Sequence, residues 1–160
     1  MPPFDASDIV ISREFSAWGN LPFDIEKETL SVISEVLGKI SPDLRLRELS
    51  IILANDDMLR HLNKGYRHQD KPTNVLSFGY GEEPLKAGIL GDLFLSFETL
   101  AREAAEQQKT FRDHYIHLII HGILHLLGYD HENEGEAKVM EDLEIQLLER
   151  FNISNPYVME

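Results

Sequence analysis

Residues 121–131 of this chain are His121-Gly122-Ile123-Leu124-His125-Leu126-Leu127-Gly128-Tyr129-Asp130-His131. The first two histidines are four positions apart, so on a helix they lie one turn apart on the same face. Gly128 follows where a left-handed glycine typically ends a helix. His131 can then turn back toward that face. The stretch predicts three imidazoles that converge at the end of a central helix.

Three imidazoles without a fourth protein ligand are typical of a metal site with an open coordination position, where a water molecule is activated. The alternative is that His121 and His125 are ordinary core residues of an apolar helix. Unpaired ring nitrogens in such a core would each cost about 1–3 kcal/mol. We therefore predict that His121, His125 and His131 bind a metal ion.

Two more histidines precede this motif. His117, His121 and His125 form one helical stripe, so His117 and His121 are a rival ligand pair. We prefer His121 and His125 because the helix is expected to end just after His125. We expect His117 to be hydrogen-bonded in the core or behind the ligands, and His114 to be a solvated residue of the first turn. Asp130 either orients a ligand imidazole or shapes the turn, and both interpretations stay open.

Gly122 stands where a zincin peptidase carries the glutamate that acts as general base. No carboxylate is therefore placed on the helix for peptide hydrolysis. A base must come from elsewhere, or the metal must generate its own hydroxide. A metallopeptidase-like hydrolase stays a rival prediction.

Outward from the motif, hydrophobic periodicity predicts a single α/β (α+β) domain over residues 1–160, with about four strands and about five helices. We expect strands at 9–11, 44–53, 75–78 and 89–95. We expect helices beginning near Asp24, Asn55, Ser96, Thr110 and Glu134, the last running to Phe151. Residues 79–86 are expected to be a loop, and the tail from Asn152 to be loose.

The composition narrows the functional classes. The 160 residues carry 15 Lys+Arg and 28 Asp+Glu, a formal net charge of −13, so bulk charge does not favour nucleic acid or membrane surfaces. No cysteine is present, which excludes disulfides, thiolate metal sites and a cysteine nucleophile. The first residues lack the features of a signal peptide, and no long apolar run occurs. We expect a cytoplasmic protein without a membrane partner.

One local segment is basic. Arg60, Lys64, Arg67 and Lys71 lie close together, and Asp70 is the only acid among them. We expect Arg60 and Lys64 to form a solvated helix face. Arg67 lies at the predicted helix end, where a guanidinium is suited to bidentate phosphate contacts. Residues 130–150 hold eight acids and two bases, and we expect them to form a solvated acidic face.

Four stretches resemble the YbeY family of bacterial ribosomal-RNA maturation factors, which are metal-dependent endoribonucleases. They are Asn63-Lys64-Gly65-Tyr66-Arg67, Asp70-Lys71-Pro72-Thr73-Asn74-Val75-Leu76-Ser77-Phe78, Leu90-Gly91-Asp92 and residues 117–132. The resemblance implies one zinc-type ion on His121, His125 and His131, although three imidazoles also suit nickel, copper or iron. It implies Arg67 as the catalytic residue across a cleft from the metal, with no further cofactor.

The resemblance also implies a substrate and partners. It suggests cleavage of single-stranded ribosomal RNA, especially the 3′ end of small-subunit ribosomal RNA, in ribosome maturation and quality control. It suggests association with small-subunit components, for which Asp92 either contacts a ribosomal protein or only closes its strand. Water and the RNA 2′-hydroxyl are both open as nucleophile. A ribosome-assembly factor with a structural metal is the rival from outside the enzymes.

Overall fold

The apolar segments in the first half of the chain form one sheet in the computed structural model, which describes residues 4–158. Its strands are β1 (Ile9–Arg13), β2 (Glu48–Ala54), β3 (Val75–Phe78) and β4 (Ile89–Ser96). The helices are α1 (Ile25–Ile40), α2 (Asp56–Arg67), α3 (Glu82–Lys86), α4 (Phe97–Glu106), α5 (Phe111–Leu126) and α6 (Glu134–Glu149). Short 3-10 turns at Ala6–Asp8 and Ser16–Gly19 flank β1.

The sheet is mixed, with strand order β1-β2-β4-β3. β1, β2 and β4 are parallel, and β3 runs antiparallel to β4 at one edge. Paired residues make continuous rows across the sheet, and one row contains Ile11, Ile51, Leu93 and Ser77. Edge strand β3 also packs against α5, the helix that carries His121 and His125.

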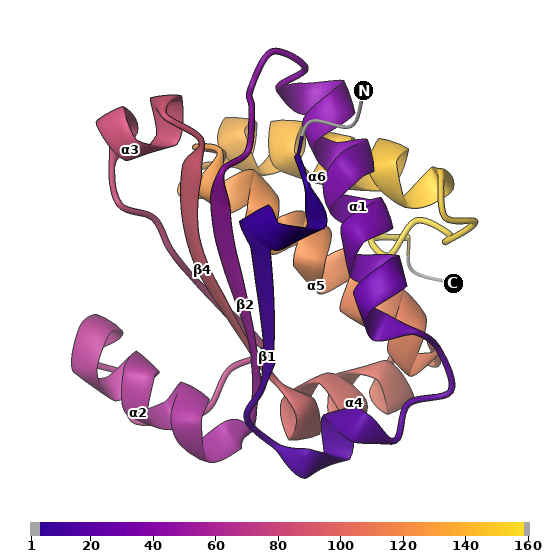
Figure 1. The fold of residues 1–160 in the computed structure, drawn as a ribbon. Coiled ribbons are helices and arrows are strands. Elements are labelled where there is room, and N and C mark those ends of the chain that lie inside the picture. Colours follow the sequence, from indigo (N-terminus) through magenta and orange to yellow (C-terminus); the bar gives the residue numbers. More distant parts are fainter. Residues whose placement is uncertain (1–3, 159–160) are drawn as a thin grey trace.

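Helices cover both faces of the sheet, as Figure 1 shows. Leu49, Ile51 and Leu53 alternate along β2 and are fully buried in the main core, which α1 and α5 help to form. A smaller apolar cluster around Leu59 and Leu76 lies beneath α2 on the other face. This layered small domain confirms the predicted fold class.

The predicted helix starts agree with the observed caps. The side chains of Asp24, Asn55 and Thr110 each accept a hydrogen bond from a backbone N–H of the first turn. Ser96 precedes α4 as expected, but its hydroxyl donates to Asp56 instead. The cap residues therefore fix where most of these helices begin.

Two details of the sequence prediction are wrong. Residues 44–46 lie outside the sheet, because β2 begins at Glu48 beside an irregularity in its pairing with β4. Residues 79–86 contain the short helix α3, so residues 4–158 form six α-helices where about five were expected. Pro84 is tolerated there because it occupies the first turn, where its missing N–H has no helical partner.

The tail beyond Asn152 is also less loose than expected. Ile153 is buried in the main core, and the Tyr157 hydroxyl donates to the carboxylate of Glu144 on α6. Tyr157 thereby connects the residues after α6 to His117 on α5 and to Glu144 on α6.

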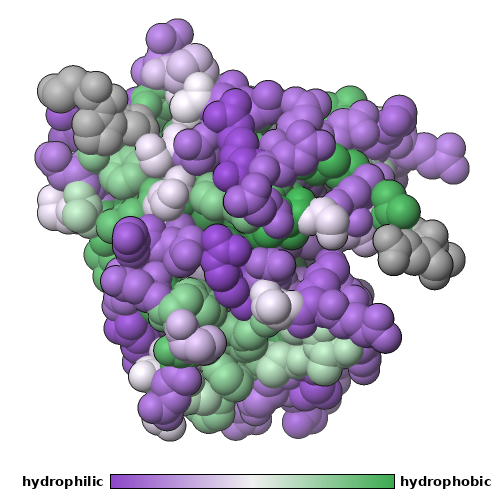
Figure 2. Space-filling view, turned by 90° about the vertical axis from the view of Figure 1, so that its right-hand side faces the viewer, coloured by the Kyte–Doolittle hydropathy of each residue, from purple (hydrophilic) through white to green (hydrophobic). Residues whose placement is uncertain are grey.

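The outer surface combines hydrophilic and hydrophobic regions. Figure 2 shows the side of the molecule that carries α1, where hydrophilic residues predominate in the upper half and along the edges and hydrophobic residues gather in the lower half. Between residues 4 and 158, every helix is too short or too polar to cross a bilayer.

Candidate metal centre and cleft

Helix α5 is the scaffold of the candidate site. Its N-terminus is capped by Thr110, whose hydroxyl accepts from the N–H of Asp113 at 3.1 Å. Most of its body is buried. At Gly122 the helix approaches the sheet so closely that an added Cβ would lie 2.8 Å from a methyl carbon of Leu93 on β4. The helix thus packs closely on β4, while His121 and His125 on the same helix remain partly exposed.

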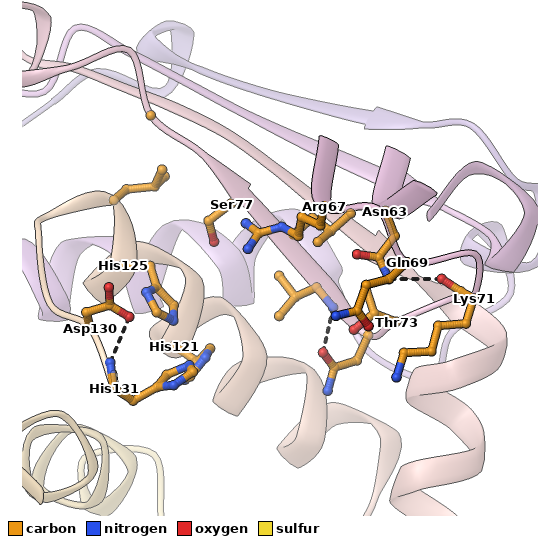
Figure 3. Close-up of a pocket in the computed structure, with 15 residues that line it drawn as sticks. Asn63, Arg67, Gln69, Lys71, Thr73, Ser77, His121, His125, Asp130 and His131 are labelled. Carbon is orange, nitrogen blue, oxygen red and sulfur yellow. Dashed lines mark hydrogen bonds between the residues drawn. The ribbon is translucent and has the colours of Figure 1, made fainter. Parts of the chain in front are cut away.

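The three predicted ligands converge. The ring centroids of His121 and His125 are 4.6 Å apart, as expected one turn apart on α5. Gly128 has a φ of 105°, which directs the chain out of the helix and back toward it. The His131 ring then lies 5.0 Å from that of His125 and 5.7 Å from that of His121, centroid to centroid. Figure 3 shows the three rings gathered on one side of the cleft.

The donor set fits a transition-metal ion. One ring nitrogen from each of His121, His125 and His131 lies within 4.8 Å of the other two, so the three can hold a metal ion. Burial and the neighbouring imidazoles His121 and His131 lower the pKa of His125 below its ordinary value. This favours the neutral ring that metal binding requires.

Glu144 holds the ring of His121, the first predicted ligand, by a hydrogen bond. Its Oε2 accepts from Nδ1 of His121 at 2.8 Å, which leaves Nε2 of His121 for an ion. Its Oε1 accepts from Nε2 of His117 at 2.7 Å and from the Tyr157 hydroxyl at 2.5 Å. Burial alone would raise the pKa of Glu144, but these hydrogen bonds outweigh burial and hold it at about 2. The expectation that His117 is hydrogen-bonded is confirmed.

Sequence reasoning missed Glu144, since the acids of residues 130–150 were expected on a solvated face. Glu144 is only 1% exposed. Its signal in the sequence is its place on α6, because it shares a buried stripe with Met140, Leu147 and Leu148. A carboxylate on the apolar face of a helix indicates a buried partner.

His114 is a second correction. It was expected to be solvated, but it is 3% exposed, and its Nε2 donates to Oε1 of Glu103 on α4 at 2.9 Å. His114 is covered because α4 packs against α5. His114 therefore ties the two helices together.

Asp130 shapes the turn that returns His131. Its Oδ1 accepts from the backbone N–H of His131 at 2.8 Å, as the dashed line in Figure 3 shows. Asp130 was expected either to orient a ligand imidazole or to shape the turn, and this hydrogen bond supports the second interpretation.

Arg67 faces the histidines across a cleft of about 590 Å³. The cleft is lined by Asn63, Arg67, Gln69, Lys71, Thr73, Asn74, Val75, Leu76, Ser77, Gly79, His121, His125, Leu126, Asp130 and His131. Helix α2 ends at Arg67 because His68 adopts a left-handed conformation, earlier than Pro72 would require. Figure 3 shows the Arg67 side chain extending from α2 into the cleft.

The Arg67 guanidinium is available for an external anion. It has no carboxylate partner among residues 4–158, and it lies 5.9 Å from the centroid of the Phe78 ring. Asp70, the nearest acid in sequence, accepts from Nε of Arg60 at 2.6 Å and lies 4.0 Å from Lys64. Arg60 and Lys64 are exposed on the outer side of α2, as expected.

Asp92 lies outside the cleft lining, on β4. The Tyr80 hydroxyl donates a short hydrogen bond to its Oδ2, and this bond, more than burial, raises the pKa of Tyr80 to about 12. Asp92 is therefore hydrogen-bonded to Tyr80, an exposed residue that follows β3.

Comparison with known proteins gives consistent relatives. A family model described as Endoribonuclease YbeY matches residues 11–152. Two proteins named Endoribonuclease YbeY, from Paramagnetospirillum magneticum and Bartonella bacilliformis, are 42% and 50% identical over 156 residues. The alignments cover 94% and 93% of this chain, and 95% and 96% of those proteins. A solution structure of a Thermotoga maritima protein superposes with a TM-score of 0.59 at 26% identity, covering 90% of this chain and 91% of that one.

Proposed function

Because this chain belongs to the endoribonuclease YbeY family, we propose that it is a metal-dependent endoribonuclease of single-stranded ribosomal RNA. Its proposed target is the 3′ end of small-subunit ribosomal RNA, in ribosome maturation and quality control in the cytoplasm. One observation carries the proposal: three convergent imidazoles and an arginine without a carboxylate partner among the described residues line the same cleft.

In this proposal His121, His125 and His131 hold one divalent ion, with Glu144 fixing the orientation of His121. Zinc suits three nitrogen donors with an open position, and the same donors accept other transition metals. When bound, such an ion supplies Lewis-acid chemistry, which withdraws charge from a phosphoryl oxygen and lowers the pKa of water.

Arg67 binds the scissile phosphate. Its planar guanidinium donates two parallel hydrogen bonds to phosphate oxygens, and it stabilises the negative charge that grows in the transition state. Lys71 also lines the cleft and adds a second positive charge for the RNA backbone. The ends of the cleavage products distinguish the two nucleophiles, because attack by the 2′-hydroxyl leaves a cyclic phosphate and attack by water does not.

The peptidase alternative lacks its general base. A glutamate at position 122 requires Leu93 or α5 to shift, because an added Cβ there would lie 2.8 Å from a methyl carbon of Leu93. Asp130 is the single carboxylate that lines the cleft in the described part of the chain, and its Oδ1 is engaged by the backbone of His131. The assembly-factor alternative requires a structural metal, whereas structural sites are closed by a fourth protein ligand. Association with small-subunit components through Asp92 remains part of the proposal, since Asp92 and Tyr80 lie together on β4 and the segment after β3.

A cleavage assay tests the proposal. Metal-loaded protein is incubated with a single-stranded RNA that spans the 3′ end of small-subunit ribosomal RNA, with the same RNA annealed to its complement, and with a peptide library. We expect cleavage of the single strand, which chelator abolishes, and no peptide cleavage. Cleavage of peptides, or RNA cleavage that chelator leaves unchanged, contradicts the proposal.

A further inference from the structure

A second cavity adjoins the cleft behind His121. It has a volume of about 380 Å³ and is lined by Asn74, Glu103, Gln107, Lys109, His114, His117, Leu118, His121, Pro156 and Tyr157. We call it the flanking cavity. It shares Asn74 and His121 with the cleft, so a strand that crosses the metal centre leads from one space into the other. The proposed mechanism does not use it.

The walls of the flanking cavity combine planar and apolar groups. The rings of His117 and Tyr157 lie 5.7 Å apart, centroid to centroid, at an interplanar angle of 87°. Leu118 and Pro156 add apolar surface. Such walls suit a flat heterocycle, because every nucleobase has a π-face that packs against rings and apolar side chains.

The polar groups of the flanking cavity have unused hydrogen-bonding capacity. Oε1 of Glu103 accepts from Nδ2 of Asn74 and from Nε2 of His114, each at 2.9 Å. Its Oε2 has no partner within residues 4–158, and neither the Gln107 amide nor the Lys109 ammonium is hydrogen-bonded or ion-paired there. The cavity thus offers a carboxylate acceptor next to amide and ammonium donors.

This mixture favours a base over a phosphate. The Glu103 carboxylate offsets the charge of the Lys109 ammonium, so the two together give no net positive charge for a phosphate, whereas Arg67 lines the cleft and not the flanking cavity. An acceptor flanked by donors matches the edge of a nucleobase, which presents N–H donors beside carbonyl or ring-nitrogen acceptors.

We propose that the flanking cavity binds a nucleobase of the RNA strand, adjacent to the linkage held between Arg67 and the histidines. This inference rests on the proposed function and adds a base-recognition site to it. It also supplies a reason for single-strand selectivity. A base in a duplex has its hydrogen-bonding edge occupied by its partner, so it cannot enter the cavity unless the strand is unpaired.

The test measures binding separately from cleavage. A fluorescein-labelled single-stranded RNA is prepared as a set in which one base at a time is removed, and affinities for the metal-loaded protein are measured by fluorescence anisotropy at one salt concentration. Lys109→Ala and Gln107→Ala are compared with wild type. Lys138→Ala is the matched control, because Lys138 is highly exposed on α6 and does not line the cavity.

We expect one abasic position next to the cleavage site to weaken wild-type binding roughly tenfold, within the range for loss of base stacking. Lys109→Ala and Gln107→Ala should bind intact RNA more weakly and lose most of this position-specific effect. Lys138→Ala should behave as wild type. A wild-type scan without any sensitive position, or variants that keep its full effect, overturns the proposal.

Glu103→Gln gives a second, isosteric test. The substitution leaves an oxygen for Asn74 and His114 but turns the free Oε2 acceptor into a donor. We expect the preferred base at the sensitive position to change, as measured with the four bases there, while the thermal unfolding midpoint stays within a few degrees. An unchanged preference contradicts base recognition by Glu103.

The two proposals fail differently. If the RNA binds with the expected sensitive position but is not cut, the flanking cavity stands and the endoribonuclease proposal fails. If the RNA is cut but no abasic position weakens binding, the endoribonuclease proposal stands and the flanking-cavity proposal fails. Absence of RNA binding by wild type overturns both.

Discussion

At the level of single residues, Arg67 is the functional group that substitution separates most cleanly from the metal ligands. It lies on α2, whereas the ligands lie on α5 and the turn after it. We predict that Arg67→Ala keeps the fold and the bound metal but raises the barrier to RNA cleavage by about 2–4 kcal/mol, as for a lost oxyanion donor. Arg67→Lys should recover only part, because an ammonium keeps the charge without the fork.

Single-turnover kinetics at one fixed ionic strength measure this effect. Arg60→Ala is the matched control, since Arg60 lies on the outer side of the same helix in an exposed pair with Asp70. It should weaken RNA binding mildly and reduce its salt dependence. Wild-type cleavage by Arg67→Ala would show that Arg67 is only a solvated residue at a helix end.

Glu144 is not a predicted ligand, but its hydrogen bond to His121 gives it an orienting role in the site. Glu144→Gln keeps the shape but replaces one carboxylate oxygen with an NH2 group, so at least one of the three hydrogen bonds accepted from His117, His121 and Tyr157 is lost. We predict a metal affinity lower by about 10–100-fold, as is typical when a ligand loses its orienting carboxylate. Competition with a chromophoric chelator measures it, with Glu149→Gln, exposed on the same helix, as control. Equal affinity in the two variants would argue against an orienting role.

The pKa of Glu144 also fixes the sign of its acid sensitivity. Folding lowers this pKa from 4.5 to about 2, so the folded state favours the ionised carboxylate. Its contribution to stability is therefore present above pH 4.5 and is lost as the pH falls toward about 2. We predict that the free energy of unfolding of the metal-free protein, measured by chemical denaturation between these pH values, falls in wild type and falls less in Glu144→Gln.

At the level of elements, the close contact between α5 and β4 decides which chemistry the histidine helix can carry. We predict that Gly122→Glu destabilises the protein, because a side chain in this well-packed contact costs about 1–3 kcal/mol before the burial of a carboxylate is counted. Chemical denaturation measures the loss, and a peptidase assay should stay negative. Wild-type stability in this variant would mean that α5 has room to shift.

The elements also show where sequence reasoning succeeds. Local signals such as the Thr110 cap, the apolar run of α5 and Gly128 act within a few residues, so the helix and the convergence of His121, His125 and His131 were predictable. His114 and Glu144 were predicted as solvated and are buried, because their exposure depends on helices distant in sequence. The partners of both residues come from tertiary packing, which periodicity along one helix does not contain.

At the level of the whole molecule, we expect the core to fold without the metal. The main apolar cluster contains none of His121, His125 and His131. We predict that chelation leaves the far-ultraviolet circular dichroism spectrum native. At a metal concentration of a hundred times Kd, removal should lower the unfolding midpoint by about 5–10 °C. A random-coil spectrum after chelation would show that the fold requires the metal, as in a structural metal site.

The central claim is that one ion on the three histidines cuts RNA, and a metal titration of activity tests it most directly. Metal-free protein is supplied with increasing zinc, and initial cleavage of a defined single-stranded RNA is recorded together with the metal bound per chain. We predict that activity rises in proportion to bound metal and levels off at about one ion per chain. His121→Ala and His125→Ala should neither bind the ion nor cut. Full cleavage before any metal is added, or an ion retained at wild-type stoichiometry in either variant, would contradict the claim.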